Sequence, residues 1–542
     1  MNVIPQALRK GSALGEDYVR GQHAHGLYEY DLQDEGALRR RADWLDSAER
    51  PRADRRALFG VLEAYNGKYN AHPAVKESLE RLKDERTLVV AGGQQSGLFT
   101  GSLLVVYKAA TIIHAAREAS RRLEREVVPV FWIAGEDHDW DEADHTYVLT
   151  PELDVRRLRM EAWHDGKSSV SEIAVSPERW EEAVAELESL LPDTEFKGEV
   201  LEMLWSELPD SVSLSAGFAR LIGRLFGRYG LILVDSADPA LRAVEQPMFR
   251  QLIERNDEFE SAYLTAARRI EDSGYEQQAQ AVEGGANLFY VHEGQRLLLF
   301  KQDGKFADRR GTVILTKEEL LERLERCPEC FSNNVLTRPL MQDYLFPVLS
   351  AVLGLGEVAY WAGTLDGFKA AGMQMPILQP RMSFTLLEPP VRKHMEHYGL
   401  SFDDVMERFD ERREAWLAEQ DKLGMDDRFE AAKAEFERLY APVIERLGEL
   451  QPGLTRLGET NRSKIIDQIS FLQGKTKQTI ERQNEAELRR WERIVKTLFP
   501  LDRPQERVYT VFYVLNRCGL EWIEELMAIE PDLTGGHRIV EL

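Results

Sequence analysis

Two apolar runs, at residues 87–93 and 126–134, dominate the hydrophobic pattern of the first 150 residues. The first reads TLVVAGG, and the second, EVVPVFWIA, is apolar on both faces. Between them, from Leu103 onward, apolar positions recur at helical spacing. A strand that is apolar on both faces is typical of a parallel sheet covered by helices on each side. The pattern predicts a strand, a helix and a second strand, and therefore an α/β core.

Two later apolar runs, 229–235 and 375–379, also have the pattern of buried strands and lie far along the chain. The sheet is therefore expected to be assembled from widely separated pieces, with insertions at about 150–215 and 270–330. The second insertion contains two strand-like runs, NLFYVH and QRLLLF, joined by Glu-Gly, which predicts a β-hairpin. The charge-rich segments of the first 85 residues predict amphipathic packing helices.

The composition changes near residue 400, where Glu, Arg, Lys and Ala become frequent. Apolar residues then recur at intervals of three, four and seven, which is a heptad-like seam. A break at Gln451, Pro452 and Gly453 separates two long helices, so the pattern predicts an antiparallel coiled-coil arm over 391–500. The segment 501–542 is too apolar for a mobile tail and is expected to dock on the core. The predicted seam consists of Phe429, Phe436, Tyr440, Val443, Leu447, Leu450 and Leu454, facing Ile465, Ile469, Leu472, Thr476, Ile480, Trp491, Ile494 and Leu498.

The net charge of −24 over 542 residues argues against nucleic-acid binding, because contacts to phosphates dominate such affinity. No apolar run reaches the ~18 residues of a membrane span, and the N-terminus has no signal-like segment. We therefore expect a cytoplasmic protein without a membrane partner that acts on small molecules. Cys327 and Cys330 have the spacing of half a zinc site, but a second pair of ligands is missing. We interpret them as two separate thiols on a loop and predict no metal site.

The segment 91–101, AGGQQSGLFTG, lies at the carboxyl end of the first strand and leads into its helix. Ligands of open α/β sheets bind there, and a helix N-terminus offers N–H groups to anions. Gly97 and Gly101 would let a nucleotide or carboxylate approach the backbone, and Lys108 would reach a phosphate. The spacing is neither GxGxxG nor GxxxxGK[ST], so the ligand stays unnamed. The alternatives are a tight connection whose glycines serve geometry alone, and a solvated or paired Lys108.

The second strand ends in Glu136, Asp137, His138 and Asp139, and this acidic run continues to His145. In a parallel sheet these groups share the crevice of the glycine loop. Crowded carboxylates suit an ammonium group, Mg²⁺ or general-base work. A metal site and a solvated turn are the alternatives.

A third block, 331–342, combines Asn333, Asn334 and Arg338. An arginine without charged neighbours suits a carboxylate or phosphate. The alternative is a capping loop ahead of a helix. Further on, Trp361 and Arg381 lie near late strands, although the tryptophan also fits a core position.

These blocks together resemble the cysteine ligase family of bacillithiol biosynthesis. The matching stretches are GGQQSGLFTGSLLVVYK, PVFWIAGEDHDWDEADH, FSNNVLTRPLMQDYLFP and GEVAYWA, in family order. The resemblance is strong over about 65–390 and looser to the C-terminus. Gly92 and Cys330 depart from the family pattern, which has a threonine and a charged residue there. The resemblance implies a Rossmann-like core over 1–390 with connecting-peptide insertions, and a coiled-coil arm that supports a homodimer.

The resemblance also implies a reaction, in which L-cysteine is added to the glucosamine amine of glucosaminyl-malate. We expect an acyl-adenylate formed from ATP with Mg²⁺, although no HIGH or KMSKS signature is present. The alternatives are a nucleotidyltransferase-like enzyme with another small acceptor, and a non-enzymatic coiled-coil scaffold that would leave these motifs unexplained. The implied cofactor-binding residues are Gln94, Gln95, Gly97, Thr100, Gly101 and Lys108. The cysteine ammonium would be bound, or the glucosamine amine deprotonated, by Glu136, Asp137 and His138. The malyl carboxylates would be held by Arg338 and Arg381, and the substrate would also contact Asn333, Asn334 and Trp361.

Overall fold

The structure, a computed structural model, describes residues 2–6, 11–47, 49–161 and 168–542. It consists of two compact units, which are described separately. Unit 1 comprises Met1–Leu386 and Pro504–Leu542, and unit 2 comprises Leu387–Arg503. The predicted arm, 391–500, lies within the bounds of unit 2. The C-terminal segment belongs to the same unit as the core.

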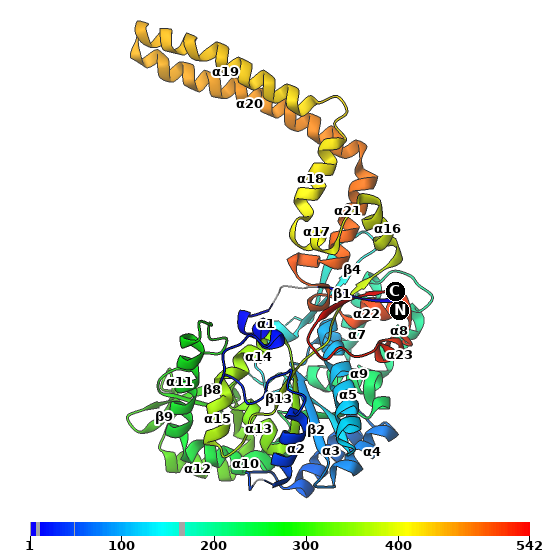
Figure 1. Ribbon diagram of the computed structural model, residues 1–542, viewed down its shortest axis with the longest axis vertical. Helices are drawn as coiled ribbons and strands as arrows, with labels where there is room; N and C mark the ends of the chain where they lie inside the picture. The colour runs from blue at the N-terminus through cyan, green and yellow to red at the C-terminus, as the bar shows by residue number, and fades with distance from the viewer. Residues whose placement is uncertain (1, 7–10, 48, 162–167) are drawn as a thin grey trace. The chain divides into compact units, whose positions relative to one another are not determined.

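A five-stranded parallel sheet lies at the centre of unit 1 (Figure 1), and the predicted α/β core is confirmed. Four of its strands correspond to predicted runs. The fifth, β12, was not predicted, because its apolar run follows helix α13 (Arg338–Leu345) with almost no polar residue between them. The strand order is β13 (Ile377–Pro380), β12 (Val348–Leu353), β2 (Leu88–Gln94), β3 (Val127–Ile133) and β6 (Ile232–Asp235).

Helices cover both faces of this sheet, as strands that are buried on both sides require. On one face, Phe131 and Ile133 pack in a cluster with residues of α5 (Leu103–Leu123) and α9 (Leu214–Phe226). On the other face, Val130 and Trp132 belong to a cluster that includes residues of α3 (Arg55–Tyr69), α4 (Pro73–Leu82), α10 (Pro239–Glu254) and α11 (Asn256–Asp272).

The second insertion forms an antiparallel sheet whose order is β10-β9-β8-β7-β11. The predicted hairpin is confirmed, since β7 (Gly285–His292) pairs with β8 (Gln295–Gln302) across Glu293 and Gly294. Both turn residues have positive φ, 49° and 75°, as a type I′ turn requires. Strand β11 (Phe331–Asn333) pairs with β7, so this sheet carries the FSNN block. Its remaining strands are β9 (Lys305–Asp308) and β10 (Ile314–Leu315), followed by α12 (Lys317–Arg326).

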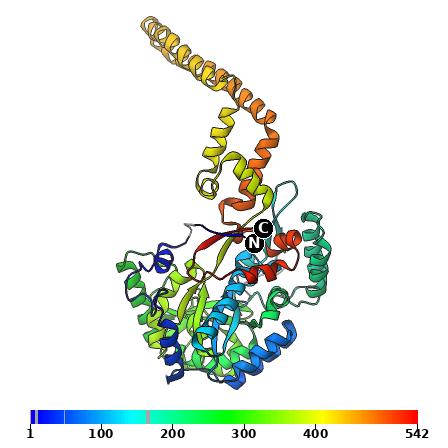
Figure 2. The same ribbon diagram turned by 45° about the vertical axis from the view of Figure 1, so that its right-hand side comes forward.

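The N-terminal and C-terminal strands pair with each other, so the ends of the chain lie side by side (Figures 1 and 2). Strand β15 (His537–Glu541) lies between β1 (Asn2–Gln6) and β14 (Ser383–Leu387). Before it, α22 (Val511–Cys518) and α23 (Trp522–Ala528) join the cluster around α5. The C-terminal segment is therefore part of the core. The remaining elements of unit 1 are α1 (Ala13–Arg20), α2 (Ala37–Ser47), α6 (Trp140–Ala143), β4 (His145–Leu149), β5 (Val155–Arg159), α7 (Pro177–Leu190), α8 (Lys197–Glu207), α14 (Leu355–Trp361) and α15 (Leu365–Ala370).

Unit 2 is helical, and α19 (Met425–Leu450) packs along α20 (Pro452–Gln483) as a hairpin that reverses at Gln451. The predicted coiled-coil hairpin is confirmed, but the predicted seam is partly wrong. Ile444 is the residue of α19 buried at the contact, because Gly458 of α20 lets the helices approach there. Val443 and Leu450 point outward and are 48% and 79% exposed. The other helices are α16 (Pro389–Tyr398), α17 (Phe402–Glu407), α18 (Phe409–Glu419) and α21 (Glu485–Leu498).

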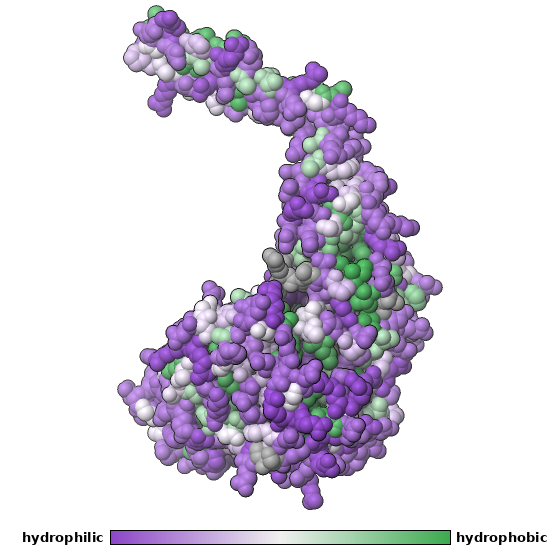
Figure 3. All heavy atoms as spheres, viewed as in Figure 1, coloured by the Kyte–Doolittle hydropathy of each residue, from purple (hydrophilic) through white to green (hydrophobic). Residues whose placement is uncertain are grey.

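The visible face of the molecule is predominantly hydrophilic (Figure 3), in keeping with the 30% of charged residues. Among the helices of the described ranges, none combines the length and the apolar character that a membrane crossing needs.

Candidate functional site

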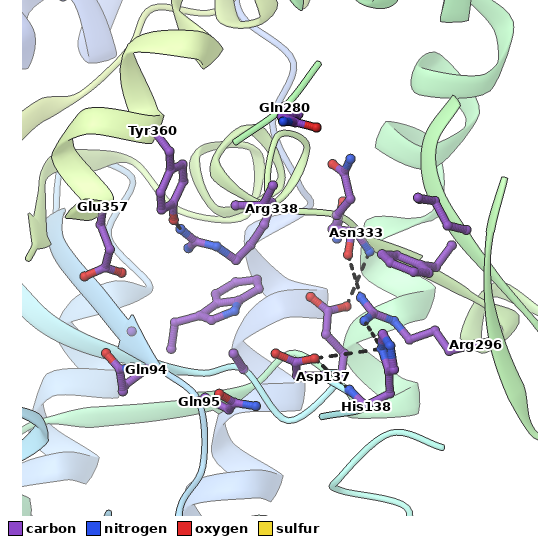
Figure 4. Close-up of a pocket in the computed structure, with 18 residues that line it drawn as sticks. Gln94, Gln95, Asp137, His138, Gln280, Arg296, Asn333, Arg338, Glu357 and Tyr360 are labelled. Atoms are coloured by element: carbon purple, nitrogen blue, oxygen red, sulfur yellow. Dashed lines mark hydrogen bonds and ion pairs between the residues drawn. The ribbon is translucent and has the colours of Figure 1, made fainter. Parts of the chain in front are cut away.

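A pocket of about 490 Å³ opens in unit 1, where the carboxyl ends of β2 and β3 meet the insertion sheet and α13 and α14 (Figure 4). This is the position expected for ligands of open α/β sheets, and the volume suits a small molecule. All three sequence blocks contribute to it. The predicted residues that line it are Gln94, Gln95, Glu136, Asp137, His138, Asn333, Asn334 and Arg338.

Glu136 is a buried carboxylate held from behind by a buried arginine. Arg242, from α10, donates to Glu136 through Nη2 and to Glu245 Oε2 through Nη1 at 2.7 Å. The backbone N–H of Asn333 also points at Glu136 Oε2, at 3.4 Å. One guanidinium therefore serves two carboxyl groups, Glu136 beside the pocket and Glu245 behind it.

This arrangement predicts a pH dependence of stability. Burial raises the pKa of Glu245 to about 7 from its ordinary 4.5, and Arg242 opposes the rise. Between these two values the folded chain keeps a proton that the unfolded chain has lost, so stability falls as pH rises through the window, by up to about 3 kcal/mol. Glu245→Gln removes the titrating group. We expect the melting temperature of the variant to fall less than that of the wild type between pH 5 and pH 7.5; parallel curves would contradict the assignment.

His138 contacts a residue that the sequence did not single out. Nη1 of Arg296, on β8, lies 3.2 Å from His138 Nδ1, whereas Asp137 Oδ1 lies 3.8 Å from the same nitrogen. The Asp137 side chain is 40% exposed, far more than that of Glu136. The two adjacent carboxylates therefore have different environments.

Asn333 is 2% exposed, and neither its Oδ1 nor its Nδ2 has a hydrogen-bond partner in the described residues. Trp132 also lines the pocket with its Nε1 unpartnered. A buried polar group without a partner is costly, which points to a ligand that supplies one. Asn334 differs, because its Oδ1 accepts from the backbone N–H groups of Leu336 and Thr337. Asn334 therefore holds the turn ahead of α13, whose N-cap is Thr337, and it also lines the pocket.

Arg338 donates hydrogen bonds to two neutral groups, Gln342 Oε1 at 3.1 Å and Tyr360 Oη at 2.7 Å. Within the described residues it forms no ion pair at 4.0 Å or less. Figure 4 shows Arg338 and Tyr360 on one side of the pocket, with Asp137, His138 and Arg296 on the other. The Arg338 guanidinium and the carboxylates of Glu136 and Asp137 thus line the same cavity.

The predicted phosphate role of Lys108 does not fit the structure. Its Nζ donates to Glu357 Oε2 at 2.5 Å, to Gly93 O at 2.7 Å and to Gln94 Oε1 at 3.0 Å, and the side chain is 1% exposed. Burial lowers the pKa of Lys108, against the attraction of Glu357. The ammonium group is fully engaged and fixes Gln94 at the pocket wall.

The glycine loop does not form an open anion site either. Gly97, Thr100 and Gly101 do not line the pocket, and Gly97 packs so closely on Gly101 that an added Cβ would lie 3.0 Å from its Cα. The N–H of Leu103, first in α5, donates to Tyr509 O at 2.8 Å. The C-terminal segment therefore covers the helix N-terminus, and the glycines serve geometry.

Arg381 and Trp361 also lie away from the pocket. Both Arg381 terminal nitrogens bind the Glu506 carboxylate, at 3.1 and 2.6 Å, so this arginine holds the C-terminal segment and not a ligand. Trp361 is fully buried beneath Arg338, whose guanidinium lies 5.8 Å from its ring. The core interpretation of Trp361 is the correct one.

Cys327 and Cys330 are joined by a disulfide, so the interpretation as separate thiols is wrong. The 3-10 turn Pro328–Cys330 brings their Cα atoms to 5.4 Å, which is within the usual range for a disulfide. Among the described residues, no group of three or more His, Cys, Asp or Glu has the arrangement of a metal site.

Comparison with known families covers both units. A family model for the N-terminal Rossmann-like domain of bacillithiol biosynthesis BshC matches residues 1–382, and a model for its C-terminal coiled-coil domain matches 384–542. The chain belongs to the bacillithiol biosynthesis BshC family. The resemblance and the fold class predicted from the sequence are thereby confirmed.

Curated members of the BshC family align along nearly the whole chain. A protein of Bacillus cereus is 36% identical over 531 residues, and one of Bacillus cytotoxicus is 34% identical over 528. A third, from Bacillus thuringiensis (strain Al Hakam), is 36% identical. Each alignment covers 97% of both chains, and each relative is named "Putative cysteine ligase BshC". The prediction of an enzyme from this ligase family is confirmed.

Proposed function

We propose that this chain joins the carboxyl group of L-cysteine to the glucosamine amine of glucosaminyl-malate. The observation that carries the proposal is the pairing of Arg338, which has no carboxylate partner in the described part, with Glu136 and Asp137 across one pocket. Both substrates carry an amine and a carboxylate. Arg338 could therefore bind a substrate carboxylate while Glu136 and Asp137 bind a substrate amine. The name of the relatives, putative cysteine ligase, supports cysteine as one of the two substrates.

The side chains suggest a division of labour. Arg338 would hold a malyl carboxylate through charge-assisted hydrogen bonds. The unpartnered groups of Asn333 and Trp132 would bind sugar hydroxyls, which both donate and accept. Glu136 and Asp137 would attract the ammonium group and take up its proton.

Activation of the cysteine carboxylate requires an energy source, for which we propose ATP with Mg²⁺, in the cytoplasm. The glycine loop does not fit phosphates, because Tyr509 occupies the first N–H of α5. Gln94 and Gln95 line the pocket and would be the residues of this loop that contact the nucleotide. Transfer of the adenylyl or the phosphoryl group of ATP to the carboxylate would supply the leaving group, and the residues of the pocket would bind and orient the substrates and move protons.

We further propose a homodimer formed through the coiled-coil arm, because large apolar side chains point outward from it (Figure 3). On α19, Leu439, Val443 and Leu450 fall on one helical face, at spacings of four and seven. We expect Val443→Glu with Leu450→Glu to halve the mass measured by light scattering. The double change Glu435→Lys and Glu449→Lys on this helix is the control, and a monomeric wild type would contradict the proposal. The other outward residues are Leu457, Phe471 and Leu472 of α20.

The reaction is tested by incubating the protein with L-cysteine, glucosaminyl-malate, ATP and Mg²⁺ and omitting each in turn. Mass spectrometry should show a product equal to the two substrates less one water, in the complete mixture only. AMP alongside it would indicate an adenylate, and ADP an acyl phosphate. Absence of product in the complete mixture, with a folded protein, would overturn the proposal in favour of another acceptor.

A further inference from the structure

Arg296 joins three segments that surround the pocket. It follows the hairpin turn on β8 and is 8% exposed, with its guanidinium 3.8 Å from the Phe289 ring centroid. Nε donates to Ser332 Oγ at 2.8 Å, and Nη2 donates to Asn333 O at 2.7 Å, both on β11. Nη1 points at His138 Nδ1, 3.2 Å away, on the loop after β3. A planar guanidinium suits such a fixed set of partners.

This contact determines where His138 carries its proton. A guanidinium has only donors and stays protonated, so His138 Nδ1 must accept. A neutral imidazole that accepts at Nδ1 carries its proton on Nε2. If the ring took up a second proton, at Nδ1, this hydrogen bond would break and a positively charged imidazolium would lie next to the Arg296 guanidinium. Figure 4 shows Arg296 and Asp137 converging on the ring, and Arg296 is the closer of the two.

The charged groups around His138 act in opposite directions. Its own loop supplies Glu136, Asp137 and Asp139, which favour an imidazolium. Arg296 on β8 opposes it, and α10 contributes Arg242 behind Glu136. The Phe289 ring of β7 covers another side, 5.9 Å away between centroids. Without Arg296 the neighbouring carboxylates would act unopposed from this side, and they would favour the protonated form of His138.

The two neighbouring carboxylates are not equivalent proton acceptors. Glu136 already accepts a hydrogen bond from the Arg242 guanidinium at Oε2. Asp137 accepts backbone N–H groups at Oδ1, from His138 at 2.7 Å and Asp139 at 3.4 Å, and forms no ion pair with lysine or arginine in the described residues. Its greater exposure places it in contact with the pocket interior.

We propose that Arg296 is a positioning residue that keeps His138 neutral with its proton on Nε2, so that Asp137 is the base that receives the proton of the attacking amine. The amine nitrogen bonds to the activated carboxyl carbon of cysteine, the bond from that carbon to the phosphate leaving group breaks, and the departing oxygen keeps the electron pair. One N–H proton passes to Asp137. This step rests on the proposed function, whereas the state of His138 does not.

Kinetics of the full chain test the assignment through Arg296→Gln and Arg296→Lys, with exposed Arg309→Gln as the control. Dividing each variant's kcat by that of the wild type removes the titration of the substrates. We expect this ratio for Arg296→Gln to fall about tenfold from pH 8 to pH 6, to fall less for Arg296→Lys, and to stay constant for Arg309→Gln. Asp137→Asn should lower kcat at least 100-fold at every pH. A constant ratio for Arg296→Gln, or an Asp137→Asn kcat within threefold of wild type, would overturn the proposal.

A measurement without substrate separates this inference from the ligase proposal. Protein labelled with ¹⁵N-histidine is followed by NMR, and the His138 signals are assigned by their loss in His138→Gln. We expect a neutral ring with the proton on Nε2 in the wild type at pH 7, and protonation at least one pH unit higher in Arg296→Gln than in the wild type. An imidazolium in the wild type at pH 7 would overturn the role of Arg296 even if the ligase reaction is confirmed. This result stands whether or not the assay yields product.

Discussion

Replacing Glu136 with glutamine should lower kcat/KM for glucosaminyl-malate about 100-fold. The carboxylate is 6% exposed beside the pocket, so little water weakens its attraction for an ammonium group. Glutamine keeps the shape and removes the charge. The loss equals about 2.7 kcal/mol, in the range for a hydrogen bond between charged groups.

Steady-state kinetics check this result, with Glu318→Gln on the exposed first turn of α12 as the matched control. Arg242 keeps Glu245 as a partner in the variant, so the fold should survive, and a melting curve verifies it. Activity within threefold of wild type in a folded variant would show that Glu136 does not contact the substrate charge.

Replacing Arg338 with leucine should raise KM for glucosaminyl-malate about 100-fold and change kcat only a few fold. Among the residues that the structure describes, the guanidinium has only Gln342 and Tyr360 as hydrogen-bond partners, so its charge is available to a carboxylate. A group that binds the ground state and the transition state equally affects KM alone. KM for L-cysteine should stay within a few fold of its wild-type value.

Arg309→Leu, at an exposed position of the insertion, is the control for this variant. An unchanged KM for glucosaminyl-malate, or an equal rise in KM for L-cysteine, would place the malyl carboxylates elsewhere.

The elements that local patterns specify were predicted well. The apolar runs of β2 and β3, and the Glu-Gly turn between β7 and β8, carry their own signals in neighbouring residues. The polar blocks after those strands also line the pocket, because the carboxyl ends of parallel strands meet at one edge of the sheet.

What the sequence could not predict depends on contacts between distant segments. Arg296 lies 158 positions from His138, and Arg242 lies 106 positions from Glu136. Neither arginine belongs to a motif. The glycine loop was misread for the same reason, since its helix N-terminus is covered by Tyr509, far along the chain. Arg381 and Lys108 have the positive charge that a ligand carboxylate or phosphate would need. In the structure, however, Arg381 pairs with Glu506 and Lys108 pairs with Glu357.

A crystal structure of the chain with bound glucosaminyl-malate would show whether this pocket holds the acceptor. We expect a malyl carboxylate within hydrogen-bond distance of Arg338, sugar hydroxyls at Asn333 and the amino group turned toward Asp137. Ligand density against the N-terminus of α5 or beside Arg381, with the pocket containing only water, would contradict it.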